Sequence, residues 1–157
     1  MLKTIILTAT LTLAGGAAFA CPNIAASGAT INASATQLYS THSYNVVAGG
    51  SSQIDKCGIR TFNGVRAEGW VMAAPDFELN YYKDANYQLE IRVVSDCDAV
   101  LLVNDGDGDW LFDDDSNANS ALDPAMRITN PAAGTYDIWV GTLTPGTCNA
   151  RLEIETF

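Results

Sequence analysis

The feature that most limits the fold of this chain is a hydrophobic period of two residues, which is too short for helices. Apolar and polar residues alternate over 87–93, and residues 151–155 repeat the pattern. Such alternation is typical of strands with one face buried and one in water. Residues 98–104 are almost continuously apolar, which predicts a strand covered on both faces. Turn-forming residues separate the runs at intervals of about 8–12 residues, the spacing of an antiparallel sandwich or barrel.

Weaker alternation marks the remaining candidate strands, at 43–47, 69–72, 77–82, 110–112, 126–129 and 136–140. Together the runs predict an all-β fold with about eight or nine short strands. Residues 22–36 are rich in Ala, Ser, Asn and Thr and predict no regular element. We therefore expect an irregular N-terminal lead over 21–42 and one β-sandwich domain over 43–157.

The first twenty residues have the three parts of a secretory signal peptide. Lys3 supplies the positive charge, residues 4–13 are apolar, and Ala18-Phe19-Ala20 is a small-x-small cleavage pattern. The apolar stretch is shorter than the about 20 residues of a membrane span, and no later segment is longer. We expect an exported protein, periplasmic or extracellular, without membrane insertion. A lipid anchor at Cys21 is the less favoured alternative, because Ala18 and Phe19 fit the lipidation pattern poorly.

Four cysteines follow the predicted cleavage site: Cys21, Cys57, Cys97 and Cys148. An even number in an exported chain predicts disulfides, and the wide spacing disfavours a zinc site. Four cysteines allow three pairings, of which we favour the sequential one, Cys21–Cys57 with Cys97–Cys148. Each bridge would stabilise the fold by roughly 3–4 kcal/mol in the chain-entropy model. A crossed pairing stays open.

Charge is unevenly distributed along the chain. Asp and Glu number 18 against 8 Lys and Arg, a net charge of −10 that disfavours a nucleic-acid binder. Eight of the acids lie within residues 96–115. Carboxylates this dense repel one another unless solvent or a cation screens them, and calcium takes six to eight such oxygens. The candidate calcium ligands are Asp98, Asp105, Asp107, Asp109, Asp113, Asp114, Asp115 and Asn117.

The spacing at 105–109 begins like an EF-hand loop but does not continue as one. Trp110 stands where that loop needs glycine, and Ser116 stands where it needs the bidentate glutamate. We expect instead a β-hairpin, with strands at 100–104 and 110–113 and carboxylates from both ends converging. The alternative is a solvated acidic loop that keeps the protein soluble and protects a sheet edge.

Three segments together resemble bacterial pre-peptidase C-terminal (PPC) domains. They are residues 95–103 (Ser-Asp-Cys-Asp-Ala-Val-Leu-Leu-Val), 110–116 (Trp-Leu-Phe-Asp-Asp-Asp-Ser) and 134–141 (Gly-Thr-Tyr-Asp-Ile-Trp-Val-Gly). Asp98 matches the first aspartate of the family pattern and Tyr136 its later tyrosine. Val100 and Leu102 depart from it, because the family has a second aspartate and a tyrosine there.

The resemblance covers roughly residues 45–157. It implies a sandwich of jelly-roll type, appended to secreted proteases in other members, and calcium binding as in the related clostridial collagen-binding domains. Within the family, the sequence looks like a stand-alone exported subgroup often labelled as peptidase S1.

A peptidase needs a nucleophile, a base and a group that orients the base. The chain has one histidine, His42, and no Gly-x-Ser-x-Gly elbow. Ser51 and Ser52 follow two glycines, which indicate a turn as readily as a nucleophile. We expect a non-catalytic exported binding or accessory module for a protein or polysaccharide, with Tyr81 or Tyr82 exposed as a binding residue. A cell-envelope structural protein whose acidic loop only solubilises it is the alternative. An orphan secreted hydrolase that uses His42 is the third.

Overall fold

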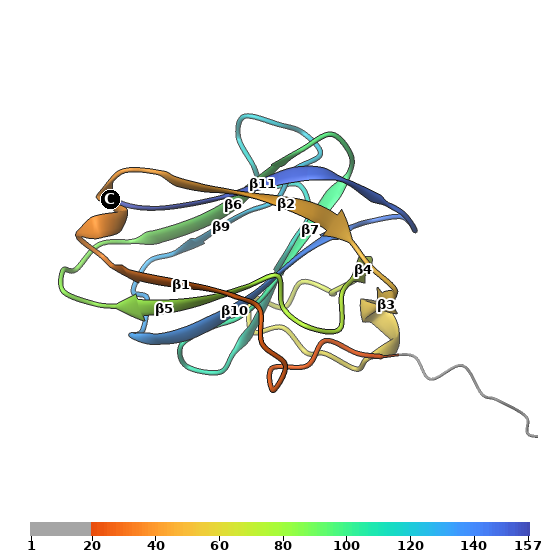
Figure 1. Ribbon diagram of the computed structural model, residues 1–157, viewed down its shortest axis with the longest axis horizontal. Coiled ribbons are helices and arrows are strands. Elements are labelled where there is room, and N and C mark those ends of the chain that lie inside the picture. Colours follow the sequence, from red (N-terminus) through yellow and green to blue (C-terminus); the bar gives the residue numbers. More distant parts are fainter. Residues whose placement is uncertain (1–19) are drawn as a thin grey trace, which may run out of the picture.

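The computed structural model describes residues 20–157 as two packed β-sheets, the all-β sandwich that the alternation predicted (Figure 1). The signal-peptide prediction, except for Ala20, falls outside the described residues. Sheet A contains β1 (Ala29–Ser34), β3 (Ser52–Gln53), β4 (Trp70–Val71), β5 (Phe77–Tyr82), β7 (Ala99–Asn104), β8 (Trp110–Asp113) and β10 (Gly134–Thr142). Sheet B contains β2 (His42–Gly49), β6 (Leu89–Ser95), β9 (Ala125–Ile128) and β11 (Thr147–Thr156). Two short 3-10 helices are η1 (Gln37–Tyr39) and η2 (Ile54–Lys56).

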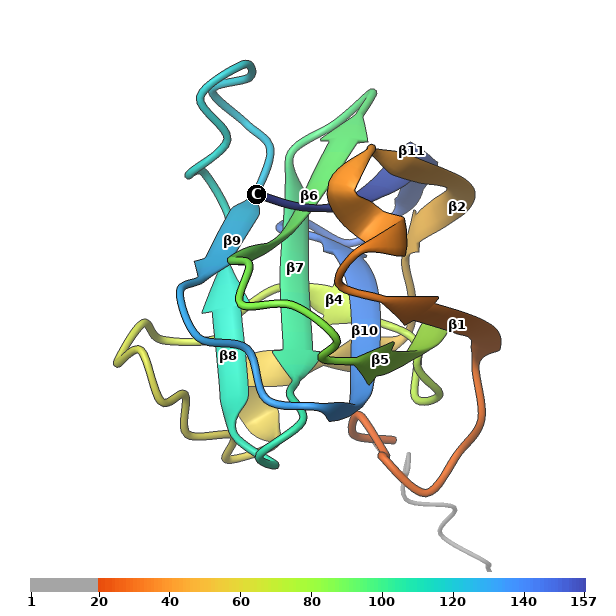
Figure 2. The same cartoon turned by 90° about the vertical axis from the view of Figure 1, so that its left-hand side faces the viewer.

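Sheet B is antiparallel throughout, in the order β2-β11-β6-β9, so β2 and β9 are its edge strands. In sheet A, β10 is the central strand. It pairs with β5 over its first half, with β7 over its second half and with β4 at its end. Strand β8 pairs with β7, which makes β8 the strand of sheet A nearest to β9 (Figure 2).

The expectation of an irregular lead over residues 21–42 is wrong, because β1 lies within it. Strand β1 also pairs parallel to β5, so the sandwich is not antiparallel throughout. Strand β1 itself has one large apolar residue, Ile31, and its Ala and Asn have low strand propensity. Pairing with β5 and burial of Ile31 and Ala33 against the core therefore form this strand, which local sequence did not predict.

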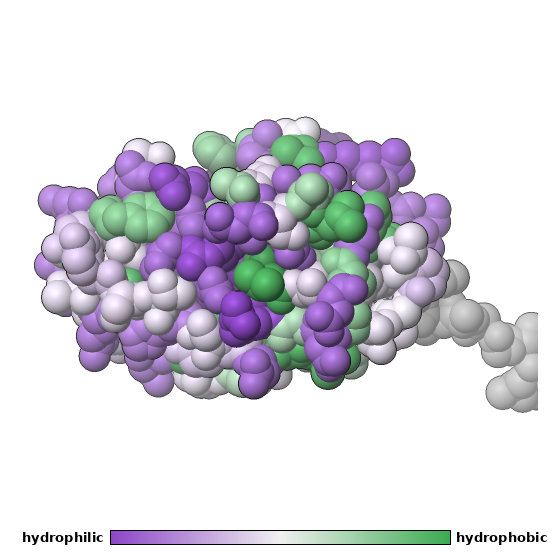
Figure 3. Space-filling view, turned by 90° about the horizontal axis from the view of Figure 1, so that it is seen from above, coloured by the Kyte–Doolittle hydropathy of each residue, from purple (hydrophilic) through white to green (hydrophobic). Residues whose placement is uncertain are grey.

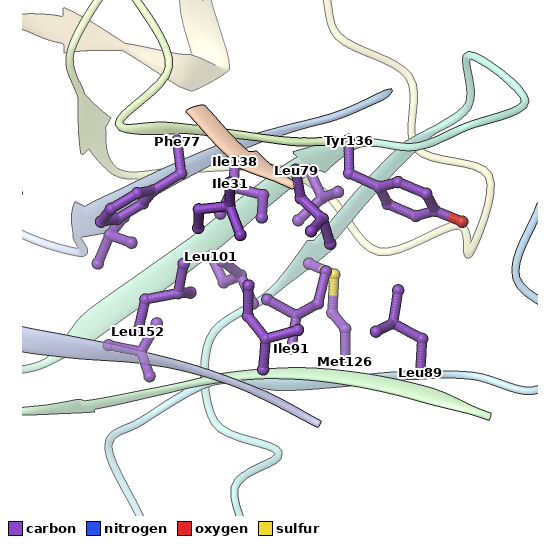
Figure 4. Close-up of a cluster of buried hydrophobic side chains, with 14 of the residues drawn as sticks. Ile31, Phe77, Leu79, Leu89, Ile91, Leu101, Met126, Tyr136, Ile138 and Leu152 are labelled. Atoms are coloured by element: carbon purple, nitrogen blue, oxygen red, sulfur yellow. The ribbon is translucent and has the colours of Figure 1, made fainter. Parts of the chain in front are cut away.

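The main core lies between the two sheets. Figure 4 shows Phe77, Leu79 and Ile138 of sheet A facing Leu89 and Ile91 of sheet B, and all five are buried. Because these side chains alternate with polar ones along their strands, the period-two pattern is explained by one buried face per strand.

A second core covers the outer side of sheet A. Val100, Leu102 and Trp139 pack there against the segment 54–69, here called the covering segment, which contributes Ile54 and Ala67. Every residue of β7 is buried, because its alternate side chains enter the two cores in turn. The prediction of a strand covered on both faces is confirmed.

Two disulfides join Cys21 to Cys57 and Cys97 to Cys148, which confirms the sequential pairing. The first ties the start of the described chain to the covering segment. The second ties the β6–β7 connection to β11. No helix within residues 20–157 has the length and apolar character needed to cross a bilayer.

The outer face of sheet B is mostly hydrophilic, as the view from above shows (Figure 3). Arg92 lies at the centre of an ion-pair network there, bonded to Glu90 (2.7 Å), Glu153 (2.8 Å) and Glu155. Arg127 also pairs with Glu90, at 2.6 Å. These pairs follow the strand register, which places Arg92 opposite Glu153 and Glu90 opposite Arg127. The charged residues of this face are thus paired with one another.

Candidate functional site

The acidic segment forms the predicted hairpin, with β7 and β8 joined by a turn at 105–109. Asp105 organises this turn. Its Oδ1 accepts the N–H groups of Asp107 (3.0 Å) and Asp109 (2.9 Å), and its carbonyl accepts the N–H of Gly108 (2.9 Å). Gly108 has a φ of +86°, which glycine adopts without strain. One predicted calcium ligand is therefore already engaged by the backbone.

Asp113 and Asn117 also have structural partners. Asp113 accepts hydrogen bonds from Ser116 on both carboxylate oxygens (2.6 and 3.1 Å) and from the N–H of Ala125 (2.8 Å). Asn117 is buried and donates from Nδ2 to the carbonyl of Val93 at 2.9 Å. These bonds hold the loop between β8 and β9 and join the two strands at one end.

The predicted ligands separate into two groups at opposite ends of the hairpin. Asp105, Asp107 and Asp109 lie at the turn, whereas Asp98 precedes β7 and Asp113–Asp115 end and follow β8. At about 3.4 Å per residue, β8 separates Asp109 from Asp113 by roughly 14 Å. No group of three or more His, Cys, Asp or Glu side chains within residues 20–157 is placed to hold a metal ion. The expected convergence of carboxylates from both ends is wrong, because the hairpin strands are extended and keep its ends apart.

The group at the far end includes an acid that sequence reasoning missed. Asp123 is only 2% exposed and accepts a hydrogen bond from Ser95 Oγ at 2.6 Å. Burial raises the pKa of Asp98, and the nearby charges of Asp115 and Asp123 raise it further. Burial, together with Asp115 and Asp113, likewise raises the pKa of Asp114. Asp123 lies beyond the dense acidic run, so only the folding of the loop brings it to this group.

A groove lies between residues of the edge strands β8 and β9. Figure 2 shows these two strands at the same edge of the sandwich. The groove has a volume of about 440 Å³. This edge groove is lined by Phe62, Asn63, Asp105, Asp107, Asp109, Leu111, Asp113, Ala125, Met126, Arg127, Ile128 and Asn130. Its size falls within the range of about 300–1,000 Å³ that is typical of ligand sites.

The edge groove combines an apolar floor with an acidic rim. Leu111 lies on the face of β8 that alternates with the outer-core residues, and Met126 and Ile128 pack with it against the main core. Phe62 stands at the rim with 76% of its surface exposed. The alternation of apolar residues predicted β8 and a strand at 126–129. The groove was not predictable, because the local sequence does not show that β8 and β9 are edge strands of different sheets that meet at the same edge of the sandwich.

Arg127, which lines the edge groove, and Lys83, which bonds to the lining residue Asn130, are both engaged by neighbours. Arg127 donates to Glu90 from Nε (3.0 Å) and Nη2 (2.6 Å) and lies 4.4 Å from the centre of the Phe157 ring. Lys83 donates to Asn130 at 2.6 Å. Asp107 and Asp109 line the groove, and their carboxylates accept none of the turn's hydrogen bonds described above. Their charge is therefore available to a ligand in the groove.

The remaining predicted residues lie elsewhere. Tyr81 is 2% exposed in the core and Tyr82 is 63% exposed, so one member of this pair is at the surface as predicted. Their binding role stays a prediction. His42 begins β2 and lies 3.2 Å from the Gln37 carbonyl through Nε2. The serines at 51 and 52 follow the other end of β2, so an extended strand separates them from His42.

Comparisons with known proteins found no matching family model and no curated protein similar in sequence. The resemblance to PPC domains therefore stays an expectation. Among solved structures, the chain is similar to PliG of Aeromonas hydrophila, a periplasmic lysozyme inhibitor of g-type lysozyme. The two share 10% sequence identity with a TM-score of 0.43, and the match covers 83% of this chain and 98% of that chain.

Proposed function

We propose that the chain is an exported, non-catalytic binding module and that its binding surface is the edge groove. The observation that carries the proposal is the combination of an apolar floor, formed by Leu111, Met126 and Ile128, with polar groups around the rim. Sites for ligands and peptides have this composition, since apolar contact supplies affinity and a few polar groups supply orientation. Aromatic residues, phenylalanine among them, are enriched at protein interfaces, and Phe62 is 76% exposed beside this floor.

Export is supported by the signal-peptide pattern and by the two disulfides, because such bridges persist in oxidising compartments. We propose a protein as the partner. The non-catalytic role is supported by the separation of His42 from the serines at 51 and 52, which disfavours the orphan hydrolase.

The competing role is a cell-envelope structural protein whose acidic hairpin only solubilises it. That role accounts for the charge of Asp107 and Asp109 but requires no groove with an apolar floor beside them. Calcium stabilisation of the acidic hairpin is a separate proposal, which rests on the density of carboxylates and is tested by the titration given in the Discussion.

The proposal is tested by selecting peptides from a random library against the mature protein and mapping the binders by amide chemical shifts. We expect binders that shift the amides of β8 and β9. Phe62→Ala should weaken them by about tenfold or more, which corresponds to about 1.4 kcal/mol or more and is usual for an aromatic anchor. Tyr82→Ala is the matched control, since Tyr82 is also an exposed aromatic residue (63%, against 76% for Phe62) but lies outside the groove. Binders that respond to Tyr82→Ala and not to Phe62→Ala would refute the proposal.

A further inference from the structure

We infer that the edge groove takes an extended basic segment of a partner protein, which adds to the free edge of β9 as a new strand of sheet B. This inference rests on the proposed function and specifies the partner. Among residues 20–157, β9 pairs with β6 alone and so has one side without a neighbouring strand. An open strand edge presents backbone N–H and C=O groups that an incoming peptide can pair with.

The register shows which backbone groups of β9 face the groove. The N–H of Val93 in β6 donates to the carbonyl of Pro124 at 3.0 Å. In an antiparallel pair, hydrogen-bonded positions recur every second residue, so Met126 and Ile128 also direct their backbone groups toward β6. Ala125 and Arg127 direct theirs outward. Asp113 already accepts the N–H of Ala125, which leaves both backbone groups of Arg127 on the open side.

The opposite wall of the groove is closed to such pairing. The carbonyl of Trp110 in β8 accepts the N–H of Phe62 at 2.7 Å, and the carbonyl of Phe112 accepts the Asn63 side chain at 2.8 Å. These two residues of the covering segment thus cap the outer edge of β8. Of the two strands that line the groove, β9 is the one that can receive a further strand.

Charge complementarity identifies the incoming segment as basic. The carboxylates of Asp105, Asp107, Asp109 and Asp113 line the groove, and the neighbouring Arg127 is held by Glu90. Such a one-sided potential steers a cationic partner and repels an anionic one. A second copy of this chain is disfavoured, because β9 of each copy would bring its own acidic rim against the other within a chain of net charge −10.

The same geometry specifies a sequence pattern. Side chains of an added strand alternate between the two faces of sheet B, so every second residue points toward the floor at Leu111, Met126 and Ile128. The partner segment is therefore extended and apolar on that face, and it carries Lys or Arg within reach of the rim carboxylates. The main-chain bonds to Arg127 would give affinity, and the alternation would give selectivity.

The probe is an eight-residue peptide that alternates lysine with valine, titrated by calorimetry and by amide shifts of the labelled protein. We expect binding that shifts the Arg127 amide and weakens as salt is raised. The double variant Asp107→Asn, Asp109→Asn should weaken it by about fivefold. The matched control is Asp96→Asn, Asp115→Asn, which removes the same charge from exposed positions at the other end of the hairpin and should leave the affinity unchanged.

Two control peptides test the mode of binding. A peptide with glutamate in place of lysine should not bind. A lysine–valine peptide with methyl groups on alternate backbone nitrogens, which cannot pair as a strand, should bind at least tenfold more weakly. Equal binding of the methylated peptide would overturn strand addition, and equal binding of the glutamate peptide would overturn the basic partner.

The outcome also separates this inference from the proposed function. If library peptides occupy the edge groove but are acidic or neutral, the inference fails and the binding module stands. If neither the lysine–valine probe nor any library peptide shifts the β8 and β9 amides, both fail. If the Arg127 amide instead shifts with protein concentration alone, the groove is an interface between copies and the inference is overturned.

Discussion

Replacing Asp76 by asparagine should stabilise the protein at neutral pH and leave it unchanged in acid. Asp76 precedes β5, and its Oδ2 accepts the N–H of Val140 in β10 at 2.7 Å. Burial raises the pKa of its carboxyl to about 6, although the hydrogen bond from Val140 opposes the shift. The ordinary value is 3.8, so the charged form is disfavoured in the fold by about 3 kcal/mol at most.

The sign of the pH dependence follows from proton uptake. Between pH 3.8 and about 6, the folded protein holds a proton on Asp76 that the unfolded chain has released. Stability contributed by this group therefore falls as pH rises through that window and stays low above it. Asparagine is neutral at every pH, and its Oδ1 can accept the same N–H. We expect a gain of about 1–2 kcal/mol at pH 8, less than the upper bound because the added amide needs a partner of its own.

Urea unfolding, followed by the fluorescence of the buried Trp139, would measure this difference at pH 4 and pH 8. Asp96→Asn is the control, since it removes a charge from an exposed position. A variant that is less stable than the native protein by the same amount at both pH values would refute the reasoning. In that case the Val140 hydrogen bond, and not the buried charge, would dominate at this position.

Three further perturbations test other parts of the structure. Arg92→Met leaves Glu90, Glu153 and Glu155 facing one another and should cost about 2–3 kcal/mol at pH 7. Because Arg92 lowers the pKa of Glu155, this loss should shrink below pH 4, and a pH-independent loss would contradict the network. The double replacement of Cys21 and Cys57 by serine should cost about 3–4 kcal/mol in urea unfolding, and an unchanged midpoint would contradict a role in stability. The calcium proposal expects millimolar calcium to raise the melting temperature more than magnesium or matched sodium chloride does. At a hundredfold excess over Kd, the gain in the free energy of unfolding would be about 2.7 kcal/mol. Asp107→Asn and Asp98→Asn would assign that rise to one end of the hairpin, and identical curves in all salts would retire the proposal.

The strands were predictable where one residue pattern decided the outcome. Residues 98–104 could be assigned to two buried faces because a continuous apolar run leaves no side for water. Strand β1 could not, since its propensity is weak and its partner, β5, lies more than forty residues further along the chain. The two-residue strand β3 carries too few side chains to show a period, whereas β4 lies within the strand predicted at 69–72.

The candidate site was less predictable for the same reason. The density of acids identified the hairpin as a candidate site. It did not show that the carboxylates of Asp105 and Asp113 accept hydrogen bonds from backbone N–H groups. The edge groove arises where β8 of one sheet meets β9 of the other, and that meeting depends on the pairing of each strand with its own sheet. The spacing of residues within one segment cannot predict where strands of two different sheets meet.

Because of the bridge between Cys21 and Cys57, the way in which the covering segment is held over the second core depends on the redox state of the compartment. In a reducing cytosol the covering segment is held over Val100, Leu102 and Trp139 by its packing alone, without a covalent tie to the N-terminal end. Under the export proposal, the chain therefore lacks this covalent restraint until it has left the cytosol. Formation of the bridge in an oxidising compartment would then tie the covering segment covalently to the N-terminal end, so this part of the fold would be completed only after export.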